Sequence, residues 1–267
     1  MTHTRPAAVA GMFYPGQAPT LRATVDHLLA AVQPIPADPP KALLLPHAGY
    51  VYSGATAAAG YALLKPWAAA IRRVVLLGPT HRVAVNGIAV PTARSFATPL
   101  GEIRLDSAGI AAIAPLSQIV FSDAVHAEEH ALEVHLPFLQ RVLEDFTLVP
   151  LAVGQAGPAA VAEVLEQLWG GPETLIIVSS DLSHFLPYAT AQQVDANTCQ
   201  HILQFDSHIR PEQACGAYPL NGLLLAAARR GLTPHLLAHC NSGDTAGDKA
   251  RVVGYAAFSF TEARHDA

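Results

Sequence analysis

Short apolar runs recur along the chain and indicate its architecture. Each is bounded by Gly, Pro or Asp, and each is nearly continuous in apolar residues rather than alternating. This pattern is typical of strands that are buried on both faces of a sheet, and such sheets are mostly parallel. The runs occupy residues 42–46, 73–79, 87–91, 146–154, 174–181, 235–240 and 251–260. We therefore expect a mostly parallel central sheet.

Helical patterns lie between these runs. They cover residues 54–65, 131–144, 158–169, 188–204 and 218–230, and a further amphipathic helix is expected around 19–32. Ala, Leu, Glu and Gln dominate the helical segments, and Gly157-Pro158 is a typical helix start. Strands that alternate with helices predict an α/β fold, here a three-layer α/β/α sandwich.

The organisation favours a single domain over residues 1–267, because the sequence contains no internal repeat and no long linker. The proline-rich stretch 34–42 is interpreted as a connection between the first helix and the first buried strand. Residues 86–106, which contain a TPLG turn, are interpreted as an inserted hairpin.

Composition narrows the classes of function. Half of the residues are hydrophobic, 14% are charged and the net charge is -5, with no run of Lys or Arg. This disfavours a nucleic-acid surface and a basic membrane patch, and no apolar stretch reaches the roughly 18 residues of a membrane span. The N-terminus lacks a signal-peptide pattern. The three cysteines form no CxxC pair, so we expect a reducing, cytoplasmic setting.

Polar side chains follow four of the predicted strands. In open α/β sheets, ligands bind at the carboxyl ends of the strands. The groups found there are His47, His81, Asp181 with His184, and the segment from Asn241 to Asp244. One histidine after a strand is more often a cap or a satisfied core residue. Four such coincidences at one sheet edge favour a metal or acid/base site instead.

The stretch HAEEHALEVHLPFL, residues 126–139, adds a helical contribution. Glu129, His130 and Glu133 have spacings that place pairs of them on one helix face. It is not an HExxH zinc motif, since His130 and His135 are five residues apart. Two interpretations stay open: a charged helix start, or residues that orient ligating histidines. Tyr50 is likewise either a ligand contact or a packing residue.

The motifs PHAGYVYSG, LGPTHR, EEHALEVHLPF, VSSDLSHF, ACGAYPL and NSGDTAGDKARVVGYAAFSF occur in this order. They resemble the Memo-like family, whose bacterial members are labelled AmmeMemoRadiSam system protein B. The resemblance runs from about Arg5 to Phe260. The family is similar to class III extradiol dioxygenases, in which two histidines and a carboxylate hold non-haem iron.

The resemblance implies roles for particular residues. His47 and His81 correspond to the two metal-binding histidines, and His184, with Asp181 beside it, corresponds to an acid/base histidine. Animal Memo proteins take a third ligand from a cysteine in the loop before the last strand, and Thr245 occupies that position here.

We predict Asp244 as the third ligand in preference to Cys240. The turn that carries Asp244 follows a strand and can aim a carboxylate at the site, whereas Cys240 lies at the strand end, where a thiol usually packs as a small hydrophobe. Two imidazoles and a carboxylate suit Fe(II), and a thiolate ligand would favour Cu or Zn.

Three functions follow as hypotheses. The first is a metal-dependent oxidoreductase that acts on a small molecule. The second is a non-enzymatic module that binds a peptide or a protein partner in the same crevice. The third is a zinc-type hydrolase, because the same residues also suit metal-activated water. No GxGxxG, P-loop or GxSxG motif supports a nucleotide-binding fold or a serine hydrolase.

Overall fold

Four parallel strands form the centre of the main sheet in the computed structural model, which describes residues 3–33 and 38–262. Their order is β2-β9-β3-β8, with bounds Pro40–Leu45, Thr174–Ser179, Arg73–Pro79 and Thr147–Val153. Apart from the first residues of β3 and β8, every position in them is buried. Helices cover both faces, which explains why these strands lack a polar face. The predicted α/β fold with a mostly parallel centre is confirmed.

Antiparallel strands extend the sheet at both edges. Beyond β2 lies β12 (Val252–Thr261), which pairs with β10 (His184–Leu186) and β11 (Thr233–Asn241). Beyond β8 lies β4 (Ile88–Val90), which is antiparallel to β8 and pairs in parallel with β7 (Ile119–Phe121). Only residues 242–251 separate β11 from β12, and a parallel crossover needs about a dozen residues or more. The last two apolar runs therefore pair as an antiparallel hairpin.

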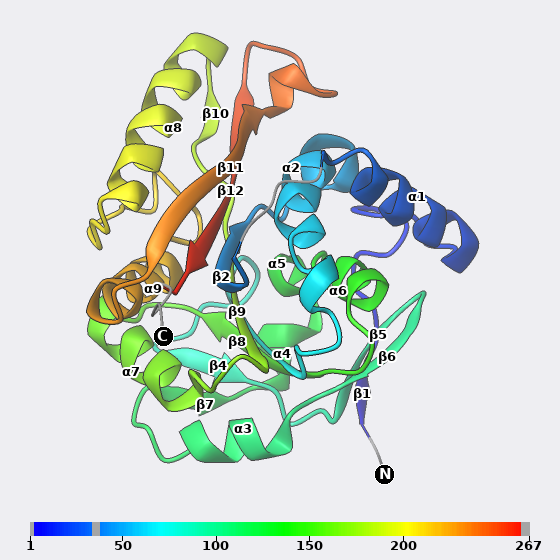
Figure 1. The fold of residues 1–267 in the computed structure, drawn as a ribbon, viewed down its shortest axis with the longest axis vertical. Helices are drawn as coiled ribbons and strands as arrows, with labels where there is room; N and C mark the ends of the chain where they lie inside the picture. Colours follow the sequence, from blue (N-terminus) through cyan, green and yellow to red (C-terminus); the bar gives the residue numbers. More distant parts are fainter. Residues whose placement is uncertain (1–2, 34–37, 263–267) are drawn as a thin grey trace.

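The helices form two layers around this sheet (Figure 1). On one side α1 packs against α2 and α6, and on the other α7 packs against α9 and α3, while α8 lies along β11 and β12. Their bounds are α1 Ala18–Ala30, α2 Tyr50–Ala62, α3 Ser107–Ile113, α6 Leu136–Val142, α7 Pro158–Leu168, α8 Tyr188–Leu203 and α9 Ala217–Arg229. The buried apolar side chains of both layers join in one cluster.

The helix predicted over 131–144 is broken. The chain forms α4 (Asp123–Ala127), α5 (His130–Glu133) and α6 in succession. The Glu129 side chain accepts a hydrogen bond from the Ala131 N–H and so caps the start of α5. Pro137, which has no N–H to donate, lies in the first turn of α6. These two residues divide the segment and leave His130 at a helix start.

The region 86–106 contributes to two sheets. β4 joins the main sheet, whereas β5 (Ser95–Thr98) and β6 (Gly101–Arg104) form a hairpin that pairs with β1 (Thr4–Arg5). The expected hairpin is thus present but shorter than predicted. Two 3-10 turns, η1 (Lys65–Trp67) and η2 (Ser242–Asp244), complete the elements. Within the proline-rich connection 34–42, residues 34–37 lie outside the described part of the chain.

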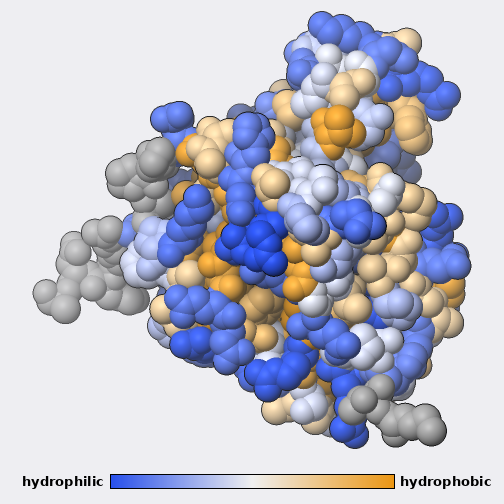
Figure 2. All heavy atoms as spheres, turned by 90° about the vertical axis from the view of Figure 1, so that its right-hand side faces the viewer, coloured by the Kyte–Doolittle hydropathy of each residue, from blue (hydrophilic) through white to orange (hydrophobic). Residues whose placement is uncertain are grey.

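The surface mixes polar and apolar residues. Figure 2 faces the side of α1, α6 and the β5–β6 hairpin, and hydrophilic residues there are interspersed with apolar ones. A low charged fraction of 14% leaves part of the surface to apolar side chains. Among the described residues, none of the helices combines the length and the apolar character needed to cross a membrane.

Candidate metal centre

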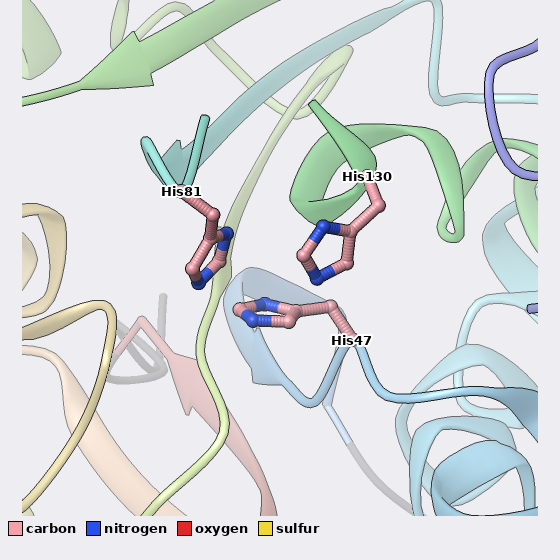
Figure 3. A group of neighbouring side chains, drawn as sticks. All are labelled: His47, His81 and His130. Atoms are coloured by element: carbon pink, nitrogen blue, oxygen red, sulfur yellow. The ribbon is translucent and has the colours of Figure 1, made fainter. Parts of the chain in front are cut away.

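Three histidines from separate parts of the chain converge at the carboxyl ends of the central strands. His47 follows β2, His81 follows β3 and His130 begins α5. Their ligand atoms all lie within 4.8 Å of one another, and Figure 3 shows the three rings around a common space. His47 is buried, His130 is half-buried and His81 is exposed. The site therefore opens to solvent on the His81 side.

Ser179 orients the ring of His47. The Ser179 hydroxyl donates its only proton to the Ala131 carbonyl, at 2.7 Å. It must therefore accept from the two imidazole nitrogens beside it, His47 Nδ1 at 2.7 Å and His135 Nε2 at 2.8 Å. His135 Nδ1 in turn accepts from the Tyr61 hydroxyl, at 2.7 Å. This network places the proton of His47 on Nδ1 and leaves the lone pair on Nε2 for a metal.

Glu129 orients His81 in a similar way. Its carboxylate lies 2.9 Å from His81 Nδ1, accepts from the His81 backbone N–H and lies 3.4 Å from His130 Nδ1. Burial would raise the pKa of Glu129, but the hydrogen bond and charge of His81, together with backbone N–H donors, hold it below its usual value. An ionised Glu129 fixes the proton of His81 on Nδ1. Carboxylate–histidine pairs of this kind commonly support metal ligands.

The N-terminal segment fixes the position of His130. Phe13 lies against the His130 ring, with 4.6 Å between the ring centroids. Glu133, in the same short helix, is fully buried and accepts from Arg5 Nη1 at 2.6 Å and from the Tyr14 hydroxyl at 2.6 Å. These contacts hold α5 against residues 5–14.

Burial holds His47 and His130, two of the three clustered imidazoles, in the neutral form that binds metals. Burial and the neighbouring histidines lower the pKa of His47 well below its usual value. Burial, followed by the charge of His81, lowers the pKa of His130 to about 4. Burial alone lowers the pKa of His135 to about 3. Neutral imidazoles are ligands that Zn, Cu, Fe and Ni all accept.

Asp181 and His184 lie beside this cluster. The Asp181 carboxylate accepts from the His47 backbone N–H at 2.7 Å, and its other oxygen lies 4.0 Å from His47 Nε2. Burial raises the pKa of Asp181 to about 7. His184 Nδ1 lies 2.8 Å from the Leu182 carbonyl and donates to it, which leaves Nε2 unprotonated. Burial lowers the pKa of His184, and the charge of His81 lowers it further.

Asp244, the predicted third ligand, is not in the group formed by the three histidines. Asp244 is exposed, and its carboxylate accepts from the Asn241 N–H at 3.0 Å and from the Tyr188 hydroxyl, which closes the capping box of η2. The nearby Thr245 hydroxyl donates to the Ser242 carbonyl at 3.2 Å. Cys240 Sγ lies 3.1 Å from the Thr56 hydroxyl. The structure groups none of these with His47 and His81, and brings His130 there instead.

Sequence reasoning missed two residues that touch His47. One is Ser179, the last residue of β9, and the other is Cys215, whose Sγ lies 3.3 Å from His47 Nε2. The available signals were the serine in VSSD and the cysteine in ACGAYPL. Neither motif indicates that its serine or cysteine side chain contacts His47.

A groove adjoins the centre on the side of the N-terminal segment. It has a volume of about 770 Å³ and is lined by residues 11–15 together with parts of α1 and α2. Phe13, which contacts His130, belongs to its wall, as do Tyr50 and Thr245. The Tyr50 hydroxyl itself donates to the Val134 carbonyl at 2.7 Å, so Tyr50 contributes mainly packing. Exposed Met12 and Val51 make the groove apolar at its mouth.

The fold and this cluster define an α/β protein with a histidine centre, able to hold a metal ion, at its strand ends. The sequence model for Memo-like protein matches residues 5–259, and the chain belongs to the Memo-like family. The resemblance seen in the motifs is thereby confirmed.

Several relatives match nearly end to end. The chain is 34% identical to a MEMO1 family protein of Ignicoccus hospitalis, over 96% of this chain and 98% of that one. It is 34% identical to MEMO1 family protein MK0963 of Methanopyrus kandleri, with the same coverage of 96% and 98%. Among solved structures, the uncharacterized protein JW3007 from Escherichia coli K12 is 12% identical, with a TM-score of 0.49 over 81% of this chain and 98% of that chain.

Proposed function

We propose that this protein is a metal-dependent oxidoreductase in which His47, His81 and His130 hold one divalent ion. The observation that carries the proposal is the hydrogen bonding of the imidazoles. The Nδ1 atoms of His47 and His81 are both engaged, by Ser179 and Glu129, so Nε2 is the nitrogen of each ring that is left to bind a metal. Imidazole ligands suit Fe(II), Cu and Zn.

The donor set leaves room for a substrate. Three protein ligands leave further coordination positions open, as in catalytic metal sites. A bound ion would supply Lewis acidity and, if it is iron or copper, redox chemistry. The exposure of His81 gives a small molecule access from solvent.

His184 is the proposed acid/base group. Its Nδ1 is engaged by the Leu182 carbonyl, so Nε2 can accept a proton from a bound ligand and return it. The lowered pKa of His184 keeps it in the basic form near neutral pH. Asp181, whose pKa burial raises to about 7, is a second group beside the cluster that can take up a proton near neutral pH.

Elemental analysis of protein purified without chelators or metal-binding tags tests the proposal. We expect one divalent ion per chain, and a strong loss of metal in H47A, H81A and H130A. D244A is the matched control and should keep its metal, because Asp244 caps η2. H184Q should also keep it, since His184 does not belong to the ligand group. A wild-type protein that binds no metal, or an H130A variant with full occupancy, would contradict the assignment.

The adjoining groove favours a second candidate function, the binding of a peptide or a partner protein. Its apolar lining and its volume of about 770 Å³ suit an extended apolar segment. Peptide binding that survives complete removal of metal, and that is lost when Val51 in the groove is replaced by Asp, would favour this function over the oxidoreductase.

A further inference from the structure

The thiol of Cys215 lies beside the atom with which His47 would bind a metal. Its Sγ is 3.3 Å from His47 Nε2, although the two residues are 168 positions apart in the sequence. We propose that Cys215 supplies a thiolate ligand to the metal centre. The inference rests on the proposed metal site and adds to it a fourth protein ligand of a different chemical kind.

The surroundings of Cys215 differ from those of a packing cysteine. Cys199 is buried and belongs to the hydrophobic core. Cys215 is only partly buried and lies outside that core. Besides His47 Nε2, its sulfur lies 3.7 Å from the Asp181 carbonyl and 3.9 Å from the Ser180 hydroxyl. A thiol surrounded by polar atoms at the edge of a histidine cluster is placed for coordination rather than for packing.

The backbone holds Cys215 firmly in this position. Its N–H donates to the Asp181 carbonyl at 3.3 Å, and the N–H of Gly216 donates to the Ser180 hydroxyl at 2.8 Å. A Cβ at Gly216 would come within 2.6 Å of the Ser179 carbonyl oxygen, so only glycine permits this close approach to the end of β9. The segment then enters the thirteen-residue helix α9. Burial raises the pKa of the Cys215 thiol, so the free protein carries the thiol, and loss of its proton accompanies metal binding.

The distance of 3.3 Å between Cys215 Sγ and His47 Nε2 suits two ligands of one metal ion. Zn–N bonds of about 2.0–2.1 Å and a Zn–S bond of about 2.3 Å place the two ligand atoms roughly 3.6 Å apart in a tetrahedron. The ligand atoms of His47, His81 and His130 all lie within 4.8 Å of one another. Cys215 does not belong to that group of three, but its contact with His47 Nε2 joins it to the cluster.

Coordination replaces the S–H bond with a sulfur–metal bond. The thiol proton leaves to solvent, and no electrons are transferred. Without metal, the thiol can donate its proton to the lone pair of His47 Nε2. Cys215 Sγ and His47 Nε2 therefore each have a partner both in the metal-free protein and in the metal-bound protein. A thiolate together with imidazoles favours Zn, Cu and Fe over Mn and Mg.

Cobalt substitution tests the proposal, because thiolate-bound Co(II) shows a strong near-ultraviolet charge-transfer band. We expect this band in the wild-type protein loaded with one Co(II) per chain, and its loss in C215S and C215A. C199S and C240S are matched controls that should keep it. The Co(II) affinity of C215S should fall at least about ten-fold, because losing even a residue that only hydrogen-bonds to a metal ligand has an effect of that size. Circular dichroism confirms that each variant is folded.

Each outcome has a distinct meaning. If the wild-type protein binds Co(II) without the band, or if C215S keeps the band, the thiolate assignment is wrong while the histidine site stands. If the wild-type protein binds no metal at all, the proposed function fails, and the thiolate ligand fails with it.

Discussion

The hydroxyl of Ser179 lies 2.7 Å from Nδ1 of His47 and so determines which nitrogen of that ring faces the candidate metal site. The same hydroxyl donates to the Ala131 carbonyl, directly after the start of α5. One side chain at the end of β9 thus connects the His47 loop with the helix that carries His130.

Replacing Ser179 with Ala should weaken metal binding about 10- to 100-fold, since the partner that fixes the tautomer of a ligating histidine is lost. It should also lower the free energy of unfolding by about 1–3 kcal/mol, because buried imidazole N–H groups lose their acceptor. Isothermal titration with Zn(II) and urea denaturation measure the two effects. S259A, which alters a buried serine of β12, is the control and should leave metal affinity unchanged.

Glu129 provides a second prediction. E129Q keeps the size of the side chain and an oxygen to cap α5, but it removes the carboxylate that faces His81. We expect metal affinity to fall about 10- to 100-fold with little change in the melting temperature. E128Q alters the neighbouring exposed glutamate and should bind metal as the wild type does. Equal affinities of E129Q and wild type would show that this carboxylate does not support the site.

The buried ion pair of Arg5 and Glu133 should contribute strongly to stability. Glu133 is fully buried and Arg5 nearly so, and their closest atoms are 2.6 Å apart. E133Q leaves the arginine charge uncompensated, which costs about 3–5 kcal/mol in buried pairs. The exposed pair of Arg104 and Asp145 is the comparison, and R104A should cost about 1 kcal/mol or less. Chemical denaturation of the two variants measures whether the Arg5–Glu133 pair contributes this much to the free energy of unfolding.

Acid should destabilise the protein partly through His126. This histidine is buried, does not belong to the cluster of His47, His81 and His130, and has its Nε2 3.0 Å from the Ala89 carbonyl. Burial lowers its pKa to about 4. Between this value and the unfolded pKa of about 6.5, His126 is protonated in the unfolded chain but not in the folded protein. Its contribution to stability is therefore complete above pH 6.5 and decreases as the pH falls toward 4.

The matching variant is H126Q, which can keep a donor to Ala89 but cannot be protonated. From pH 7.5 to pH 5 the wild type should lose about 2 kcal/mol more unfolding free energy than H126Q does. Denaturant titrations of both proteins at the two pH values measure the difference. Parallel pH dependence of the two proteins would remove His126 as a source of acid sensitivity.

Much of the architecture was predictable from the order of apolar residues. Runs such as 73–79 and 174–181 have no polar face, and this pattern alone requires a sheet that is covered on both sides. The rule that ligands bind at the carboxyl ends of such strands then placed His47 and His81 at one edge. Both inferences depend only on local sequence, because burial and strand direction are properties of each run and its connections.

Only the tertiary structure decided which side chains complete the site. Asp244 has the right chemistry and follows a strand, but its carboxylate is used within its own turn, where nearby backbone donors are available at little entropic cost. His130 reaches His47 because the predicted long helix is divided beside Glu129 and α5 is then held by residues 5–14. Cys215 reaches the same imidazole from the start of α9. The sequence by itself determined the strands and the two histidines at their ends, whereas the remaining partners depend on packing between segments far apart in the chain, which no local pattern encodes.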